Sequence, residues 1–187
     1  MIFFVGAGPG APDLITVRGK KAIESADVII YAGSLVNPAL LEDTRPDCRC
    51  FNSAAMTLEE VIAVMTDPEN QRKTIVRLHT GDPCLYGAIR EQMDLLDAHG
   101  LDYEVIPGVS SFIGAAAALK AEYTLPEVSQ TVILTRMEGR TPVPEQEDIV
   151  KLAAHGATMV IFLTTTMLGE LSRRLIQGGY APDAPAA

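Results

Sequence analysis

Short apolar runs alternate along the chain with longer segments whose apolar residues recur at helical spacing. The first five runs predict strands at Ile2–Val5, Val28–Tyr31, Cys48–Phe51, Thr74–Leu78 and Tyr103–Ile106. The helices that follow them are expected near Asp13–Ser25, Pro38–Thr44, Leu58–Thr66, Ala88–His99 and Ser111–Leu119. Strands that alternate with helices form parallel or mixed sheets covered by helices. Residues 1–120 therefore predict an N-terminal α/β domain with a five-stranded, mainly parallel sheet.

The last of these helices has an unusual composition. Residues 113–119 read Ile-Gly-Ala-Ala-Ala-Ala-Leu, which is small and apolar on every side. A helix that is hydrophobic all round is typical of a protein interior. We therefore expect this helix to be buried against the sheet.

A more polar stretch, residues 121–130, is interrupted by Pro126 and is predicted to be a linker. After it, the pattern predicts two further strands and two further helices, at Thr131–Thr135, Thr158–Leu163, Glu145–His155 and Met167–Gln177. Residues 131–187 would then begin a C-terminal α/β domain. Because a stable sheet generally needs three or more strands, we expect this second domain to be incomplete and the chain to be a fragment.

The composition fits a folded globular protein, with 48% hydrophobic residues among 187 and a mean hydropathy of +0.18. There are 15 basic and 24 acidic side chains, a net charge of −9, which argues against nucleic acid and anionic membranes as partners. No apolar run approaches the ~20 residues that a bilayer crossing needs, and no basic segment precedes the first strand. We expect a cytoplasmic protein whose cysteines, Cys48, Cys50 and Cys84, are reduced and hold no metal.

A glycine-rich loop, Val-Gly-Ala-Gly-Pro-Gly at residues 5–10, follows the first strand. It differs from the dinucleotide-binding fingerprint, because Pro9 follows the second glycine and Gly10 comes one position early. Proline lacks the N–H group that a phosphate cradle uses. The structural alternative is a rigid turn from strand to helix, with Asp13 as the helix N-cap.

Two further loops follow later strands: Thr-Gly-Asp-Pro-Cys-Leu-Tyr-Gly at residues 80–87 and Pro-Gly-Val-Ser-Ser at residues 107–111. Open α/β sheets bind their ligands beyond the carboxyl ends of the strands. Each loop also has a plain structural interpretation, as a Gly-Asp-Pro turn or as serine helix caps. Three such loops at one sheet edge nevertheless predict a binding site.

Taken together, the three loops resemble those of the tetrapyrrole methylase family of S-adenosylmethionine-dependent enzymes. Within that family, residues 80–92, 125–136 and 138–141 are most similar to the precorrin-4 C11-methyltransferases of cobalamin synthesis. The uroporphyrinogen III methyltransferases carry a different run after their Gly-Asp-Pro. The resemblance implies two α/β domains, a homodimer, S-adenosylmethionine as cofactor and methylation of precorrin-4 or cobalt-precorrin-4 at C11.

The resemblance also implies which residues contact the cofactor: Pro9, Gly81, Asp82, Pro83, Leu85, Tyr86, Ser110, Ser111 and Leu163. It identifies no catalytic base. Guanidinium groups pair well with carboxylates, so three arginines are candidates for binding the acetate and propionate groups of the substrate: Arg90, Arg136 and Arg140. The alternative for each is a solvated surface arginine.

Two residues near the Gly-Asp-Pro turn lie outside the predicted cofactor contacts. His79 either touches substrate or forms a structural hydrogen bond. Cys84 has no neighbouring base, so we assign it no nucleophilic role. Three other functions stay open: a different tetrapyrrole methylase such as uroporphyrinogen III methyltransferase, a ribose methyltransferase acting on ribosomal RNA, which the acidic charge disfavours, and a truncated fragment that only binds.

Overall fold

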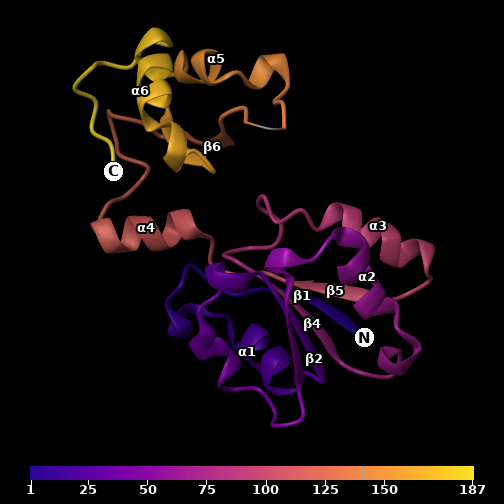
Figure 1. Ribbon diagram of the computed structural model, residues 1–187. Coiled ribbons are helices and arrows are strands. Elements are labelled where there is room, and N and C mark those ends of the chain that lie inside the picture. The colour runs from indigo at the N-terminus through magenta and orange to yellow at the C-terminus, as the bar shows by residue number, and fades with distance from the viewer. Residues whose placement is uncertain (140) are drawn as a thin grey trace. The chain divides into compact units, whose positions relative to one another are not determined.

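The computed structural model describes residues 1–139 and 141–187, which divide into two compact units, residues 1–117 and 118–187. The first unit is built on a five-stranded sheet in the order β3-β2-β4-β1-β5, and every neighbouring pair is parallel (Figure 1). Its strands are β1 (Ile2–Gly6), β2 (Val28–Tyr31), β3 (Arg49–Asn52), β4 (Ile75–His79) and β5 (Tyr103–Ile106). Each strand begins and ends within one residue of its predicted range. The predicted α/β fold with a five-stranded parallel sheet is confirmed.

The central strands read as nearly continuous apolar runs because helices cover both faces of the sheet. Helix α1 (Val17–Glu24) covers one face, and α2 (Leu58–Thr66) and α3 (Arg90–Ala98) cover the other (Figure 1). The core on the α1 side includes Val5, Ile23, Ile29, Val76 and Leu78. The core on the opposite side includes Ile2, Phe4, Ile30, Ile62, Ile75 and Leu96. Alternate residues of each strand thus enter different cores.

The start of α1 differs from the prediction. Asp13 is not its N-cap, because Asp13 lies in a separate 3₁₀ helix, Pro12–Leu14. The chain is extended at Thr16, with φ −68° and ψ 149°, and the Thr16 hydroxyl accepts a hydrogen bond from Gly19 N at 3.1 Å. Threonine with extended backbone is a favoured N-cap. The α-helix therefore begins at Val17.

Other predicted helices are shorter than expected. The segment predicted as a helix at Pro38–Thr44 is a 3₁₀ helix, Pro38–Leu41. Helix α3 starts after Ala88, whose positive φ of 48° is incompatible with an α-helix. These shifts arise from local backbone geometry, to which apolar periodicity is insensitive.

Helix α4 (Ser111–Leu119) has the predicted bounds, but the prediction that it is buried is wrong. None of its residues is buried among the described residues, and Ile113 and Leu119 are 47% and 57% exposed. Its run of alanines favours a helix by intrinsic propensity, without any need for packing. Small apolar residues on every side therefore did not indicate burial here.

The second unit contains a two-stranded parallel sheet, β6 (Val132–Arg136) and β7 (Thr158–Phe162). Helix α5 (Ile149–Ala153) is shorter than the predicted Glu145–His155, because Asp148 is extended and accepts a hydrogen bond from Val150 N at 2.9 Å as an N-cap. The predicted linker, residues 121–130, lies in this unit and holds a turn in which Leu125 N bonds to Ser129 O at 2.8 Å.

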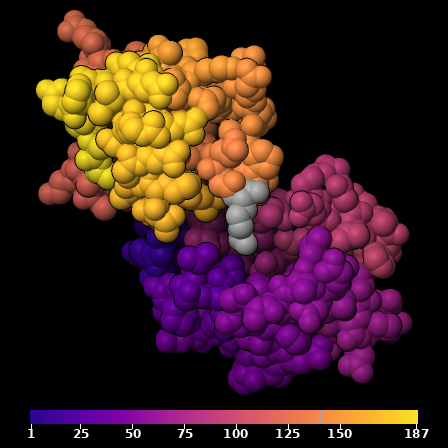
Figure 2. Space-filling view, turned by 45° about the horizontal axis from the view of Figure 1, so that its top comes forward, coloured from indigo at the N-terminus to yellow at the C-terminus, as the bar shows by residue number. Residues whose placement is uncertain are grey.

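Helix α6 (Leu168–Gln177) packs against α5, and Arg174 pairs with Asp148 between them. None of its residues is buried, and Figure 2 shows the C-terminal residues in yellow on the surface of this unit. Across residues 1–139 and 141–187, no helix is long and apolar enough to cross a membrane.

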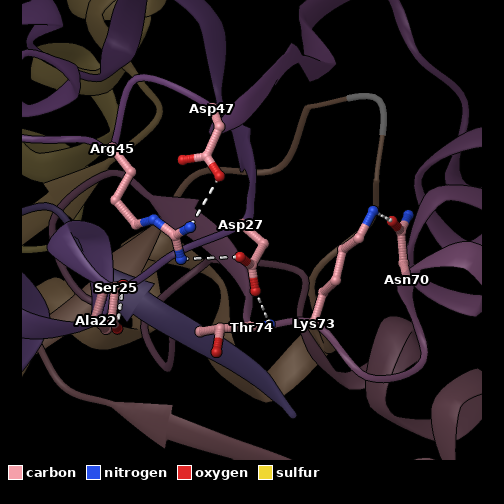
Figure 3. A network of polar contacts seen from close by, with 8 residues as sticks. All are labelled: Ala22, Ser25, Asp27, Arg45, Asp47, Asn70, Lys73 and Thr74. Atoms are coloured by element: carbon pink, nitrogen blue, oxygen red, sulfur yellow. Dashed lines mark hydrogen bonds and ion pairs between the residues drawn. The ribbon is translucent and has the colours of Figure 1, made fainter.

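A polar network lies at the amino-terminal edge of the five-stranded sheet (Figure 3). The Asp27 carboxylate accepts hydrogen bonds from Thr74 N at 2.8 Å and from Arg45 at 3.1 Å. The buried Asn70 side chain accepts from Lys73 Nζ at 3.3 Å. These contacts connect the segments that lead into β2 and β4, at the edge opposite to the three loops.

Candidate functional site

The loops that follow β1, β4 and β5 lie side by side, because β1 is between β4 and β5 in the sheet. Ala7 N donates to His79 O at 2.7 Å. Gly8 and Gly81 exchange two hydrogen bonds, at 3.2 Å and 2.9 Å. The backbones of the first two loops are therefore joined directly.

Glycines allow the third loop to approach these two. A Cβ on Gly108 would stand 2.2 Å from the carbonyl oxygen of Gly81, and one on Gly6 would stand 2.5 Å from Gly108 Cα. Both distances are far below van der Waals contact. Glycine is thus required at these positions for close backbone packing.

The Asp82 side chain ties the second loop to the third. Its Oδ1 accepts a hydrogen bond from Cys84 N at 2.8 Å, and its Oδ2 accepts one from Gly108 N at 2.9 Å. The first of these bonds is the local Asx type that favours turns. The second spans from the loop after β4 to the loop after β5. Both carboxylate oxygens are therefore engaged with backbone N–H groups.

The loop after β4 continues through a tightly packed turn. A Cβ on Gly87 would stand 2.1 Å from Pro83 O, and both of its neighbours have positive φ, 57° at Tyr86 and 48° at Ala88. Residues other than glycine rarely adopt this conformation, and such strain is concentrated at functional sites. Leu85 is half-buried and Tyr86 is 42% exposed. This turn presents an apolar and an aromatic side chain at the sheet edge.

His79, the last residue of β4, lies beneath these loops and is only 5% exposed. Its Nε2 has no hydrogen-bond partner among the described residues. Its ring centroid is 6.0 Å from that of Phe4. Burial, assisted by the charge of Arg77, lowers the pKa of His79 to about 3. The imidazole is therefore neutral at physiological pH.

Arg77 lies two residues before His79 on the same face of β4 and is 8% exposed. It donates to Ile30 O at 3.2 Å, Ser53 Oγ at 3.0 Å and Gln92 Oε1 at 3.2 Å. All three acceptors are neutral, and burial lowers the pKa of Arg77 to about 10. Arg77 is not among the site residues predicted from the sequence. The available signal was one arginine within the otherwise apolar run before His79.

The whole chain, including these three loops, matches a known protein family. The sequence model of the family described as tetrapyrrole (corrin/porphyrin) methylases matches residues 1–187. The chain belongs to the tetrapyrrole methylase family.

Named relatives show which members of the family this tetrapyrrole methylase resembles. It is 59% identical over 186 residues to the cobalt-precorrin-4 C(11)-methyltransferase of Methanocaldococcus jannaschii, a match that covers 100% of this chain and 72% of the relative. It is 48% identical over 184 residues to the Priestia megaterium enzyme of the same name, covering 98% and 71%. The X-ray structure of a cobalt precorrin-4 methyltransferase, a cobalamin biosynthetic enzyme, superposes with a TM-score of 0.92 at 48% identity, covering 96% and 75%. The predicted resemblance is confirmed.

Eight of the nine residues that were expected to contact the cofactor lie on the three loops of this tetrapyrrole methylase: Pro9, Gly81, Asp82, Pro83, Leu85, Tyr86, Ser110 and Ser111. Pro9 is half-buried and faces Gly114, where a Cβ would stand 2.6 Å from the proline Cβ. The ninth, Leu163, belongs to the second unit. It lies just beyond the end of β7, is 72% exposed and has a φ of 56°. The cofactor contacts themselves stay predictions.

Two of the candidate substrate arginines, Arg90 and Arg136, have partners of their own. Arg90 forms an ion pair with Asp94 at 2.5 Å. Arg136 donates to Met137 O at 3.2 Å, and its other bonds, at 3.0 Å and 2.9 Å, go to the carbonyl oxygens of residues 141 and 142. The Arg136 guanidinium is therefore bonded to backbone carbonyls of the loop that follows its own strand, β6. Arg140 lies outside the described residues. The roles of Arg90, Arg136 and Arg140 in substrate binding stay predictions.

The cysteines of this tetrapyrrole methylase are all free thiols. Cys84 is exposed in the loop after β4. Partial desolvation of its thiol, together with the charge of Asp82, raises the pKa of the thiol. A raised pKa lowers the thiolate fraction, so Cys84 lacks the activation of a nucleophilic cysteine. The part of the chain that the structure describes contains no cluster of three His, Cys, Asp or Glu side chains arranged to hold a metal ion.

Proposed function

We propose that this protein transfers the methyl group of S-adenosylmethionine to C11 of precorrin-4, preferably in its cobalt form. The main support is the 59% identity to a cobalt-precorrin-4 C(11)-methyltransferase along the whole chain. The Priestia megaterium relative, at 48% identity, is also named for the cobalt form, whereas the relatives from Mycobacterium tuberculosis and Pseudomonas aeruginosa, named for precorrin-4, are 44% and 45% identical. This ordering favours the cobalt-bearing macrocycle.

The three loops fit the methyl donor. Gly81 has a φ of 60°, which favours glycine, and its Cα lies directly beside the β5 loop, where a Cβ would stand 3.4 Å from Ser111 N and 3.5 Å from Ser110 Cα. Loop backbone and the two serines would meet the polar amino-acid end of the donor, and Leu85 and Tyr86 would pack beside it. When bound, S-adenosylmethionine supplies an electrophilic methyl group on a sulfonium.

The contribution of the chain is mainly alignment. Methyl transfer from an activated sulfonium depends on holding the reacting atoms in line and excluding water. The hydrogen bonds between Gly8 and Gly81 and between Asp82 and Gly108 fix the loops before any ligand arrives. A preformed surface reduces the ordering cost of binding.

We also propose that the protein is a cytosolic homodimer. Three free cysteines are typical of a reducing compartment. Large apolar side chains are exposed on and just after α4, and covering them would remove apolar area from water: Ile113, Leu119, Leu125 and Val128. Light scattering coupled to size-exclusion chromatography tests this, and a monomer at all concentrations would refute it.

The activity is tested with purified protein, isotopically labelled S-adenosylmethionine and three macrocycles: cobalt-precorrin-4, precorrin-4 and uroporphyrinogen III. We expect label at C11 and the highest kcat/KM with cobalt-precorrin-4, with mass spectrometry and NMR locating the methyl group. Transfer to uroporphyrinogen III alone would favour the other methylase, and binding of S-adenosylhomocysteine without any transfer would favour a binding-only protein.

A further inference from the structure

Asp82 is the side chain that connects the loops after β4 and β5. It is half-buried, and its two carboxylate oxygens accept one backbone N–H each, from Cys84 and from Gly108. Hydrogen bonds to an ionised acceptor are roughly twice as strong as neutral ones. A single side chain thus bridges two of the three loops.

Side chains from two neighbouring segments form hydrogen bonds with the loop after β5. The loops after β1 and β4 are joined by the reciprocal bonds of Gly8 and Gly81. The loop after β5 instead receives the Asp82 bond at 2.9 Å and a longer bond, 3.4 Å, from the Thr16 hydroxyl to Pro107 O. The packing of Gly108 against Gly81 prevents closer approach but does not hold the loops together. Of these two bonds, the one to the Asp82 carboxylate is the shorter, so Asp82 restrains the segment that carries Ser110 and Ser111.

We infer that Asp82 is a positioning residue, which holds the β5 loop in register with the β4 loop so that Ser110 and Ser111 meet the methyl donor. It does not bind the donor through its own carboxylate. This inference rests on the proposed function. It gives the Asp82 side chain a role that the sequence-based expectation, a contact between the cofactor and the Asp82 backbone, left open.

The test compares Asp82→Asn, Asp82→Ala and a control, Asp43→Asn. Asparagine offers one acceptor oxygen, so one of the two backbone N–H groups loses its partner. We expect the Kd for S-adenosylhomocysteine to rise about tenfold in Asp82→Asn, which corresponds to ~1.4 kcal/mol, and further in Asp82→Ala. Asp43 pairs with Lys20 on α1 at 3.0 Å, in an exposed ion pair, and its substitution should leave the Kd unchanged.

The second readout is hydrogen exchange of the Gly108 amide, measured by NMR. Positioning predicts that weaker binding and faster Gly108 exchange occur together, at an unfolding temperature close to that of the wild type. Weaker binding with unchanged Gly108 exchange would mean direct contact and overturn the inference. An unchanged Kd with faster exchange would also overturn it. If the wild-type protein bound no S-adenosylhomocysteine, the proposed function itself would fail.

The wild-type protein provides a test that does not depend on the variants folding. In the absence of ligand, the Gly108 amide should already exchange slowly, and ligand should add little further protection. Rapid exchange of this amide in the free protein would show that the loop is not held in place, which contradicts the inference.

Discussion

Arg77 on β4 donates its Nε–H to the side-chain oxygen of Gln92 on α3, at 3.2 Å, within the core. Gln92 in turn donates to Ala88 O at 3.1 Å. A charged group is thus buried with neutral acceptors only, and its hydrogen bonds attach α3 to the central strand. Buried polar groups are costly when a partner is removed.

Replacing Gln92 with leucine should therefore destabilise the protein by about 1–3 kcal/mol, because the Nε–H of Arg77 loses its acceptor. Adding Arg77→Met should recover part of the loss, since both partners are then apolar. The free energy of unfolding is measured by urea titration. Gln71→Leu, at an exposed position, serves as the control, with an expected change within ~0.5 kcal/mol. Equal losses in Gln92→Leu and Gln71→Leu would contradict this interpretation.

The buried His79 predicts a pH dependence of stability. Its pKa is about 3 in the folded protein, against 6.5 for an unperturbed histidine. Between these two values the unfolded chain binds more protons, so the free energy of unfolding falls as the pH is lowered from 6.5 towards 3. The slope from this one group approaches ~1.4 kcal/mol per pH unit.

Urea titrations at pH 7, 6 and 5 should show a shallower pH dependence for His79→Gln than for the wild type. His155, an exposed residue after α5, provides the matched substitution His155→Gln. Carboxylates contribute to the slope in every variant, so the difference between the two substitutions isolates His79. Identical slopes would show that the buried imidazole is readily protonated.

Two glycine substitutions should have opposite effects. Gly108→Ala places a Cβ 2.2 Å from Gly81 O, a backbone atom, so the loops must separate and the loss should exceed ~3 kcal/mol. Gly169→Ala in α6 meets nothing within 4 Å and should stabilise by ~0.5–1 kcal/mol through helix propensity. Differential scanning calorimetry distinguishes these outcomes, and a neutral Gly108→Ala would refute the close-packing argument.

Much of the fold follows from the sequence, because a parallel sheet buries both faces and its strands are short apolar runs. Ile2–Gly6 and Val28–Tyr31 are of this kind. Helix boundaries were less predictable. The N-cap of α1 is Thr16 and not the predicted Asp13, because a 3₁₀ helix that begins at Pro12 precedes it. The spacing of apolar residues does not detect such a 3₁₀ helix. Helix α4 was misjudged because alanine favours helices whether buried or exposed.

The loops of the candidate site were predictable from their motifs and their common sheet edge, but the interactions within them were not. That Asp82 bonds to Gly108, 26 residues later, depends on tertiary packing. The burial of Arg77 likewise depends on the packing of α3 against the sheet. Sequence motifs identify which loops carry the candidate site residues. The hydrogen-bond partners of each polar atom in those loops depend on the tertiary structure.

The tight turn around Gly87 limits how this site can be redesigned. Because Pro83 O occupies the space of a side chain at position 87, that position must remain glycine in any engineered library. Variation can enter through the side chains of Cys84, Leu85 and Tyr86. At position 86 the left-handed backbone favours asparagine, aspartate or glycine. A redesign of this turn can therefore vary residues 84–86, whereas Gly87 must stay fixed.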